Sequence, residues 1–426
     1  MANLITAQRG TRDVLPPESA LWDRIESACR DQFKRYDFHE IRTPLFEATE
    51  LFARGIGEAT DIVSKEMYTF TDRGDRSITL RPEGTAGVVR AFLQGNLANV
   101  MPSPVKLWYA GPMFRYERPQ AGRQRQFHQV GVEVLGSADP KADAEVITLA
   151  HDIFNMLEVK GLRVELNSLG CETCRPAYRD RLVAYFRDRH ASYCSTCLER
   201  IETNPLRVLD CKVPSCKDLN REAPSIQEVL CEECQAHQDA LLRYLEVVAV
   251  ETKINPRLVR GLDYYTRTVF EIVASEKLGS QDTVCAGGRY DKLVAECGGP
   301  PTPAVGWAFG EERLAMLLAD RTLASEVDCF IVPLGEEAEL AAFKLAHGLR
   351  QVLPLRIETS FGSRKLKKQL EMADRLRARW VVLLGEDEVR SRTLTLKNLL
   401  TKDQETVELS VEALSARLAG GRSDSQ

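Results

Sequence analysis

Residues 114–133 read FRYERPQAGRQRQFHQVGVE, a stretch in which four arginines lie within eleven positions: Arg115, Arg118, Arg123 and Arg125. The runs on either side, VKLWYAGPMF (105–114) and QFHQVGVEVLG (126–136), are rich in β-branched and aromatic residues and predict two strands joined by a long cationic loop. A planar guanidinium group matches phosphate oxygens and keeps its charge at physiological pH. The loop is therefore a candidate phosphate site, in which Arg123 and Arg125 could close over a polyphosphate. A solvated hairpin with surface ion pairs is the alternative.

Further short strand-like runs lie close to this hairpin in the sequence. HEIRTPLF (39–46), EMYTFTD (66–72) and SITLRPE (77–83) follow an amphipathic helix predicted over 18–36. Strands so closely spaced, without helices between them, predict an antiparallel sheet. Neither GxGxxG nor GxxxxGK[ST] occurs in the sequence, which excludes the Rossmann and P-loop solutions to nucleotide binding.

The composition is that of a globular protein of two or three domains, with 426 residues, 44% of them hydrophobic and 28% charged. The formal net charge is −5, so any nucleic-acid-binding surface must be local. The start MANLITAQRG lacks the basic and apolar regions of a signal peptide, and no apolar run approaches the ~20 residues that span a bilayer. We therefore expect a cytoplasmic protein without membrane contact.

The strand and helix patterns predict an α+β fold with two sheet domains and an insertion. Residues 1–325 are expected to form the larger domain, an antiparallel sheet flanked by helices, and a helical, cysteine-rich insertion over 170–255 interrupts it. From 326 to 420, alternating strands and helices followed by a hairpin predict a smaller α/β domain. The polar tail 421–426 is expected to be disordered.

Eight of the 12 cysteines lie within the 64 residues from 171 to 234, and they are paired along the sequence: Cys171 and Cys174, Cys194 and Cys197, Cys211 and Cys216, and Cys231 and Cys234. In a reducing compartment such pairs hold metal more often than they form disulfides. Four pairs suffice for two tetrahedral Cys₄ zinc sites, which would stabilise an insertion with little core of its own. Free thiols and an iron–sulfur cluster are the alternatives.

A basic helix is predicted in the smaller domain. The run SRKLKKQLEMADRLRARW (363–380) carries seven Lys and Arg against two Asp and Glu. Its apolar residues recur with helical spacing and are expected to face a core, which leaves the basic residues outward: Leu366, Leu370, Ala373 and Leu376. Such a helix is either a solvated face or a surface for phosphate contacts with RNA.

Several stretches resemble a known family. Motif 2 of the class II aminoacyl-tRNA synthetases is resembled by FRYERPQ followed by RQFHQ, and motif 3 by GWAFGEERL (306–314). Motif 1, which forms part of the dimer interface in that class, is resembled by EIRTPLFE (40–47). More specifically, four stretches are similar to histidyl-tRNA synthetases: RGLDYYTRTVFE (260–271), AGGRYDKL (286–293), LRPEGTAGVVRA (80–91) and GTRDVLPPE (10–18). The resemblance covers nearly the whole chain, in the expected order.

The resemblance implies a histidine pocket formed by nine residues: Glu83, Gly84, Thr85, Arg115, Gln129, Glu133, Arg260, Tyr264 and Tyr265. It assigns ATP to Arg115, Glu117, Arg123 and Arg313, and it makes Arg115 and Arg260 the catalytic residues. These side chains suit the ligands, since Glu83, Thr85 and Gln129 offer oxygens to an ammonium group. Glu133 and Tyr265 could hold an imidazole from opposite sides. The attacking carboxylate of histidine is already ionised at pH 7, so catalysis needs positioning and charge neutralisation and no general base.

The activity implied by the resemblance is that of a homodimeric histidine–tRNA ligase. With Mg²⁺ accompanying ATP, it would convert L-histidine to histidyl-adenylate and pyrophosphate, and then transfer histidine to the 3′ end of tRNA(His). The insertion would contact the acceptor arm, with structural Zn²⁺ supporting it, and residues 326–420 would bind the anticodon.

Two alternatives belong to other functional classes. One is a catalytically inert paralogue that acts as a regulatory subunit in histidine biosynthesis, and the other is a zinc-dependent RNA-binding module. The chain retains Arg115, Arg260 and Arg313 and has the domain after residue 325, and both facts favour the enzyme.

Overall fold

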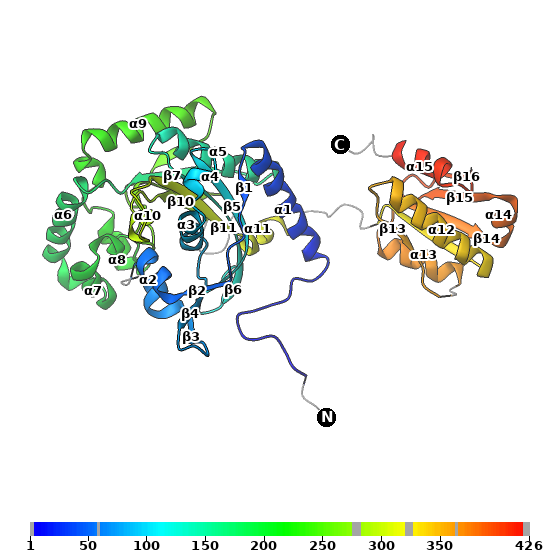
Figure 1. Ribbon diagram of the computed structural model, residues 1–426, viewed down its shortest axis with the longest axis horizontal. Helices are drawn as coiled ribbons and strands as arrows, with labels where there is room; N and C mark the ends of the chain where they lie inside the picture. Colours follow the sequence, from blue (N-terminus) through cyan, green and yellow to red (C-terminus); the bar gives the residue numbers. More distant parts are fainter. Residues whose placement is uncertain (1–3, 58–59, 275–282, 320–326, 363–364, 421–426) are drawn as a thin grey trace. The chain divides into compact units, whose positions relative to one another are not determined.

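The structure is a computed structural model that describes residues 4–57, 60–274, 283–319, 327–362 and 365–420. The chain divides into two compact units, Met1–Asp320 and Arg321–Gln426 (Figure 1). The tail 421–426, for which disorder is expected, lies outside the described residues. In the described part of the chain, none of the helices combines the length and the apolar character needed to cross a bilayer.

The first unit is built on an eight-stranded sheet with the order β1-β5-β6-β11-β10-β9-β7-β8. Its strands are β1 (His39–Glu40), β5 (Val105–Phe114), β6 (Gln126–Leu135), β7 (Arg163–Ser168), β8 (Thr252–Ile254), β9 (Thr266–Val273), β10 (Thr283–Arg289) and β11 (Ala304–Gly310). Neighbouring strands from β5 to β7 in this order run antiparallel, as predicted, and only the edge pairs β1–β5 and β7–β8 are parallel. The hairpin β5–β6 is the one that the opening stretch of sequence predicts.

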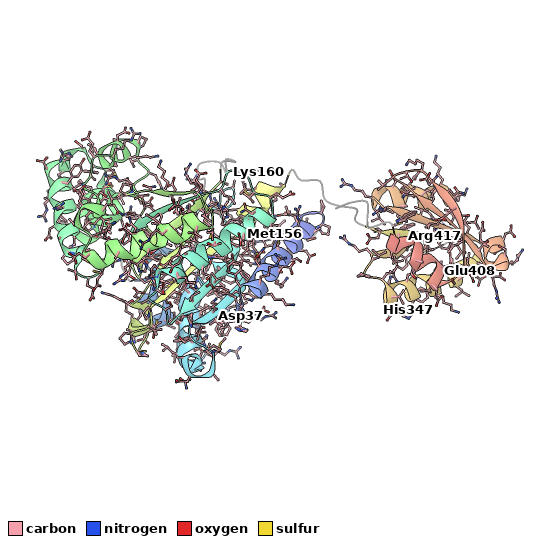
Figure 2. The ribbon with its side chains drawn as sticks, turned by 90° about the horizontal axis from the view of Figure 1, so that it is seen from above. Asp37, Met156, Lys160, His347, Glu408 and Arg417 are labelled. Carbon is pink, nitrogen blue, oxygen red and sulfur yellow. The ribbon has the colours of Figure 1, made fainter. Side chains whose placement is uncertain are left out.

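Helices of this unit pack on both sides of the sheet. They are α1 (Glu18–Arg35), α2 (Thr49–Ile56), α3 (Thr85–Gln94), α4 (Leu97–Val100), α5 (Pro140–Met156), α10 (Leu293–Glu296) and α11 (Glu311–Leu318). Helices α1, α5 and α11 pack together against one face. Helix α1 matches its predicted range and ends before Asp37, which lies in the left-handed region with φ of 59° (Figure 2). On the other face, α3 packs its Val88 and Phe92 into a core with Leu107 and Tyr109 of β5.

Three of the predicted strand runs form a small separate sheet. Its order is β2-β4-β3, with β2 (Phe46–Ala48), β3 (Tyr68–Thr71) and β4 (Ser77–Leu80). The run 39–46 is therefore two elements, β1 and the start of β2, with Pro44 in the irregular segment between them. Proline has no N–H to donate to a ladder, so a strand does not continue through it in a sheet interior.

The insertion between β7 and β8 is helical, as predicted, and Figure 1 shows it in green at one side of the unit. Its helices are α6 (Cys174–Asp188), α7 (Ser195–Thr203), α8 (Pro214–Asn220) and α9 (Glu232–Val247), with short helical turns η2 (His190–Ser192), η3 (Pro205–Val208) and η4 (Ile226–Val229); η1 (Ile62–Glu66) lies earlier in the chain. The expectation of little core is wrong. Tyr178, Leu182 and Phe186, spaced four apart on α6, are fully buried with Ile201 and Val208.

The second unit is a five-stranded sheet with helices on both faces, with the order β13-β12-β14-β15-β16. Its strands are β12 (Cys329–Leu334), β13 (Ile357–Thr359), β14 (Trp380–Gly385), β15 (Thr393–Asn398) and β16 (Gln404–Glu408), and its helices are α12 (Glu336–Val352), α13 (Leu366–Arg375), α14 (Glu386–Ser391) and α15 (Val411–Gly420). Alternation along β12 directs Ile331 toward α12 and Phe330 toward α13. Helices α12 and α15 pack together, and Figure 2 labels one residue of each, His347 and Arg417.

The basic helix α13 is shorter than its sequence pattern indicates. Leu370, Ala373 and Leu376 pack into the core as expected, but Leu366 at the first position is 39% exposed. Gln369 is buried instead of Leu366. Its side-chain amide donates a hydrogen bond to the carbonyl of Pro333 at 2.8 Å. A polar residue can occupy a core position when its hydrogen bonds are made.

Candidate active site

The candidate site lies on the sheet face opposite α5. Trp307 of β11 donates its indole N–H to the carbonyl of Val146 in α5 at 2.7 Å, and Phe309 stacks edge-on against Phe154 of α5. Because side chains alternate along a strand, the intervening residues of β11 face the other way, and all of them are small: Gly306, Ala308 and Gly310. This row of small residues leaves room for a ligand above the sheet.

A cavity of about 910 Å³ occupies that space. Eleven of the twelve residues assigned by resemblance line it: Glu83, Thr85, Arg115, Glu117, Arg123, Gln129, Glu133, Arg260, Tyr264, Tyr265 and Arg313. Gly84 is not among the lining residues. It packs against the ring of Tyr109, which does line the cavity. A Cβ at Gly84 would lie 2.2 Å from the ring of Tyr109, so only glycine lets α3 approach β5 this closely.

Glu83 lies at the N-terminus of α3, where its carboxylate is held by backbone donors. One oxygen accepts from the N–H of Thr85 at 2.7 Å and the other from that of Ala86 at 2.9 Å. Burial raises the pKa of Glu83, although these hydrogen bonds act in the opposite direction. The carboxylate is therefore fixed in orientation at the wall of the cavity.

Glu133 is the most enclosed acid of the site and is 1% exposed. It accepts from the hydroxyl of Thr85 at 2.7 Å, from Tyr109 at 3.4 Å, and from Tyr290 in a short hydrogen bond. Tyr264 extends this aromatic wall, with its ring centroid 5.6 Å from that of Tyr290. Burial raises the pKa of Glu133 to about 8, even though hydrogen bonds from Tyr290 and Thr85 favour the ionised form.

Gly306 makes the position of Glu133 possible, and this leads to a prediction for Gly306→Ala. The new methyl group would lie 1.9 Å from a carboxylate oxygen of Glu133 and 2.4 Å from the carbonyl of Val132. Overpacking of this kind costs about 1–3 kcal/mol, and here the displaced group is Glu133, which the sequence resemblance assigns to the histidine pocket. We expect a lower melting temperature and a loss of histidine binding, measured by calorimetry.

Gly55→Ala is the matched control, because a methyl group there would make only ordinary contacts at 3.4 Å inside α2. Histidine affinity in Gly306→Ala equal to that of this control would contradict the role of the small residues.

The cationic end of the cavity is formed by the β5–β6 loop. Arg115 donates from Nε to the carbonyl of Pro82 at 2.8 Å, and its guanidinium lies 5.2 Å from the ring centroid of Phe127. Glu117 contacts Arg123 at 3.4 Å and Arg115 at 3.9 Å. Arg115 is thus supported from two sides directly after the end of β5, whereas the side chain of Arg123 is 43% exposed.

Not every arginine of the loop belongs to this end. Arg125 stacks on Tyr116, with its guanidinium carbon 3.9 Å from the ring centroid, and its backbone N–H donates to Gly10 at 2.7 Å. It joins the N-terminal segment to the loop and is absent from the described cavity lining, and Arg118 is exposed. The expectation that Arg125 closes over a polyphosphate is not supported by this geometry.

Arg260 and Arg313 complete the cationic part of the lining, and Arg313 lies against Gly122 of the β5–β6 loop. Arg260 is paired with Glu271 of β9, and although burial lowers its pKa, the attraction of Glu271 outweighs this and the pKa is raised. Burial and the charge of Arg123 lower the pKa of Arg313. A guanidinium group remains protonated at neutral pH in either case, so both residues carry positive charge into the cavity.

Three buried polar atoms of the lining have no hydrogen-bond partner within the described residues: Oε1 of Gln129, Nε of Arg163 and Nε of Arg260. Buried polar atoms are nearly always paired, so an unpaired acceptor and an unpaired donor in one cavity indicate a ligand with both groups. An α-amino acid has an ammonium donor and a carboxylate acceptor.

Comparisons with known proteins identify the family of the chain. A family model described as histidyl-tRNA synthetase matches residues 10–314, and one described as anticodon binding domain matches residues 328–419. The chain belongs to the histidyl-tRNA synthetase family. It is 49% identical over 411 residues to the histidine–tRNA ligase of Desulforamulus reducens, covering 95% of this chain and 97% of that one. It is 48% identical over 417 residues to that of Trichlorobacter lovleyi, with coverage of 98% and 99%. A crystal structure of apo histidyl-tRNA synthetase from S. aureus has a TM-score of 0.80 and 37% identity, covering 97% of this chain and 100% of that one.

Three residues of the site are absent from the set assigned by sequence: Tyr109, Glu271 and Tyr290. Each lies in a quoted stretch, since Tyr109 is in the strand before the arginine loop and Glu271 and Tyr290 belong to the two stretches similar to histidyl-tRNA synthetases. Their roles depend on cross-strand register. In β5, Tyr109 pairs with Gly131, whose missing side chain lets the tyrosine ring lie over β6 toward Glu133.

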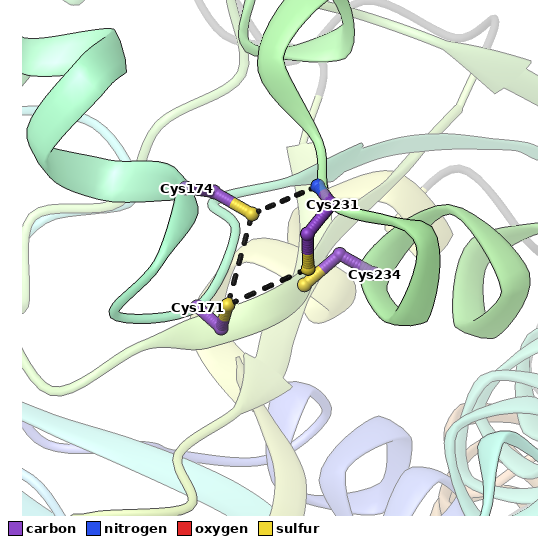
Figure 3. Close-up of side chains that lie close together, drawn as sticks. All are labelled: Cys171, Cys174, Cys231 and Cys234. Carbon is purple, nitrogen blue, oxygen red and sulfur yellow. Dashed lines mark hydrogen bonds between the residues drawn. The ribbon is translucent and has the colours of Figure 1, made fainter.

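The cysteines of this synthetase-family chain form two groups of four. One group joins the first and last CxxC pairs, Cys171, Cys174, Cys231 and Cys234 (Figure 3), and the other joins Cys194, Cys197, Cys211 and Cys216. In each group the ligand atoms lie within 4.8 Å of one another, with sulfur separations of 3.7 Å in the first and 3.9 Å in the second. Four sulfurs at 2.3 Å from one tetrahedral zinc ion would be about 3.8 Å apart. Both groups thus have the donor set and spacing that a single metal ion requires.

Proposed function

We propose that this protein is a histidine–tRNA ligase, which activates L-histidine with ATP and transfers it to tRNA(His). The observation that carries the proposal is the composition of one cavity. Buried acids, Glu83 and Glu133, lie at one end, and Arg115, Arg260 and Arg313 line the same cavity. A zwitterionic amino acid with an imidazole suits the first end, and a polyphosphate suits the arginines.

The residues support the first step as follows. The ammonium group of histidine is held by Glu83, Thr85 and the unpaired oxygen of Gln129, while Glu133 accepts the imidazole N–H. The histidine carboxylate attacks the α-phosphorus of ATP, a P–O bond to the β-phosphate breaks, and pyrophosphate leaves with its Mg²⁺. Arg115 and Arg260 offset negative charge at the α-phosphate, and Arg123 and Arg313 hold the β- and γ-phosphates.

The second step and the assembly extend the proposal beyond the cavity. We propose that residues 1–325 catalyse both steps, that the insertion 170–255 contacts the acceptor arm, and that residues 326–420 bind the anticodon. A homodimer is supported by large apolar side chains exposed within the stretch that resembles motif 1 and on the β2–β4–β3 sheet: Leu45, Phe46 and Phe70, with exposures of 44%, 56% and 47%. Analytical ultracentrifugation tests this assembly.

Zinc is the metal that we propose for both cysteine groups. A closed set of four sulfurs with no carboxylate or imidazole is typical of structural zinc. An iron–sulfur cluster would spread its four cysteines over different iron atoms and so hold their sulfurs farther apart than the 3.7–3.9 Å seen here. When bound, the ions would supply folding energy rather than chemistry at the reacting atoms.

ATP–pyrophosphate exchange, measured with each of the twenty amino acids, tests the enzymatic proposal. Exchange is expected with histidine alone, followed by charging of tRNA(His) with histidine. Absence of exchange with any amino acid, from folded and metal-replete protein, would favour the regulatory paralogue. The curated relatives favour the ligase, since those compared above bear that name over 97–99% of their own length.

A further inference from the structure

The group Cys171, Cys174, Cys231 and Cys234, here called the proximal centre, lies at the root of the insertion (Figure 3). Cys171 follows β7 by three residues, Cys174 begins α6, and the other pair lies at the start of α9. Closing this group joins two parts of the chain that are 60 residues apart. A metal ion that closes such a loop restricts both parts at once.

The backbone before the proximal centre is hydrogen-bonded to the end of the histidine-pocket segment. Leu169 donates to the carbonyl of Arg267 at 2.6 Å, and Arg267 donates back to the carbonyl of Gly170 at 3.0 Å. Arg267 has φ of 48°, a conformation that L-residues rarely adopt and that surrounding contacts must hold. It follows Tyr264 and Tyr265, the two tyrosines of the pocket, by three and two residues.

A side chain from the first turn of α6 reaches the same segment. Arg175, next to Cys174, donates from Nη2 to the carbonyl of Tyr265 and from Nε to that of Leu169 at 3.2 Å. Its own backbone N–H donates to the carbonyl of Cys171 at 3.0 Å. The position of this guanidinium, and with it the Tyr265 carbonyl, therefore depends on how the CxxC loop is folded.

Each of the two CxxC loops also carries a glutamate, and this glutamate forms an ion pair with a basic residue close in sequence to the pocket tyrosines. Glu172, inside Cys171–Cys174, is paired with Lys292, and Glu233, inside Cys231–Cys234, contacts Arg267 at 3.3 Å. Lys292 follows Tyr290, the residue that hydrogen-bonds Glu133, by two positions. The proximal centre is thus connected to each of the two stretches that carry the pocket tyrosines.

We propose that metal at the proximal centre positions the histidine pocket, so that losing it weakens histidine binding while ATP binding is retained. The contacts above run to Tyr265, Arg267 and Lys292, whereas Arg115 and Arg123 are supported by Pro82, Phe127 and Glu117 of other segments. The cysteines here are positioning residues. This inference rests on the proposed function, because it takes the cavity to be a histidine site.

The second group, here called the distal centre, provides the comparison. Cys197 and Cys216 are fully buried in the core of the insertion with Tyr178, Phe186 and Ile201. Its cysteines Cys194 and Cys211 border a second cavity, whose lining includes Arg207 and Lys212 and also Arg260 of the pocket, but none of the described hydrogen bonds of these cysteines reaches Tyr264 or Tyr265. Metal at the distal centre is expected to hold the insertion together, and its loss is not expected to reach the tyrosines.

The test measures zinc content by mass spectrometry, histidine affinity by calorimetry, and KM for ATP in pyrophosphate exchange. The wild type should hold two zinc ions per chain. Cys234→Ser should hold one and bind histidine about tenfold more weakly, with KM for ATP unchanged within twofold. Cys197→Ser should also hold one zinc ion, with histidine affinity within twofold of the wild type.

Arg175→Ala keeps the proposal testable if Cys234→Ser does not fold. This variant should retain both zinc ions and still bind histidine several-fold more weakly. It removes the hydrogen bonds of Arg175 to the carbonyls of Tyr265 and Leu169 but leaves the four cysteines of the proximal centre in place. Arg181→Ala, on the exposed face of the same helix, is its matched control and should bind histidine as the wild type does.

Three results would overturn the inference: a wild type without zinc, unchanged histidine affinity in Cys234→Ser or Arg175→Ala, or an equal loss in the proximal and distal variants. A wild type that binds histidine without catalysing exchange would refute the proposed enzyme and leave the affinity comparison decisive. A wild type that does not bind histidine would refute both.

Discussion

Arg260→Ala is expected to lower the rate of histidine-dependent ATP–pyrophosphate exchange by about 10³-fold, because a fixed charge aimed at a developing anion is worth that much in a buried site. Arg260 is paired with Glu271, and its Nε atom has no partner among the described residues. The guanidinium is therefore oriented by Glu271 and by the neighbouring Tyr265, while its Nε donor remains for a ligand. We expect the loss mainly in kcat, since the charge matters most in the transition state.

The control separates catalysis from folding. Removing Arg260 leaves Glu271 without its cation, so the double variant Arg260→Ala/Glu271→Gln should melt at a higher temperature than Arg260→Ala and remain equally inactive. Arg187→Ala, at an exposed ion pair with Glu202 in the insertion, should exchange at the wild-type rate. Less than a tenfold loss in Arg260→Ala would remove Arg260 from the catalytic residues.

Glu133→Gln is expected to raise KM for histidine by about tenfold, because a carboxylate that ionises on binding the imidazole makes a charge-assisted hydrogen bond where the amide makes a neutral one. The same change should alter how stability depends on pH. Burial raises the pKa of Glu133 to about 8, above its ordinary value of 4.5. Between these two values the folded protein keeps a proton that the unfolded chain releases, so the free energy of unfolding falls as pH rises from about 4.5 to about 8.

Because glutamine cannot ionise, Glu133→Gln should lose this part of the pH dependence. Its melting temperature should rise relative to the wild type as pH increases from 5 to 8, when both proteins are measured without ligand. Glu311 is the matched control, since burial raises its pKa to about 8 as well and it is not part of the described cavity lining. Glu311→Gln should show the same stability trend with an unchanged KM for histidine. A wild-type KM in Glu133→Gln would contradict the proposed imidazole contact.

Local patterns were sufficient to predict most strands and helices of this chain. The periodicity of apolar residues and the local composition correctly located three features: the hairpin around the arginine loop, helix α1 and the α/β pattern after residue 327. The separate β2–β4–β3 sheet was not predicted, because short strands do not reveal which sheet they join. Helices α14 and α15 were also missed, and α14 has only six residues, too few for a periodic signal.

The site was accessible to sequence reasoning only through resemblance. Glu133 alone is an acid on a strand, and nothing in its neighbours along the chain indicates burial beside Tyr290, which is 157 positions away. The cysteines show the same limit. Spacing identifies the pairs, but which two pairs share an ion depends on how helices α6 to α9 fold. Cross-strand register and long-range packing are therefore what the structure adds.

The row Gly306, Ala308 and Gly310 also limits how the pocket can be redesigned. Two of these three positions have no side chain to shorten, so substitutions there can make the chamber smaller but cannot enlarge it. Acceptance of a bulkier amino acid would have to come from the facing aromatic wall, where Tyr264 and Tyr290 have atoms to lose. Laboratory evolution toward larger substrates should accordingly select changes in the tyrosines and leave the strand beneath them intact.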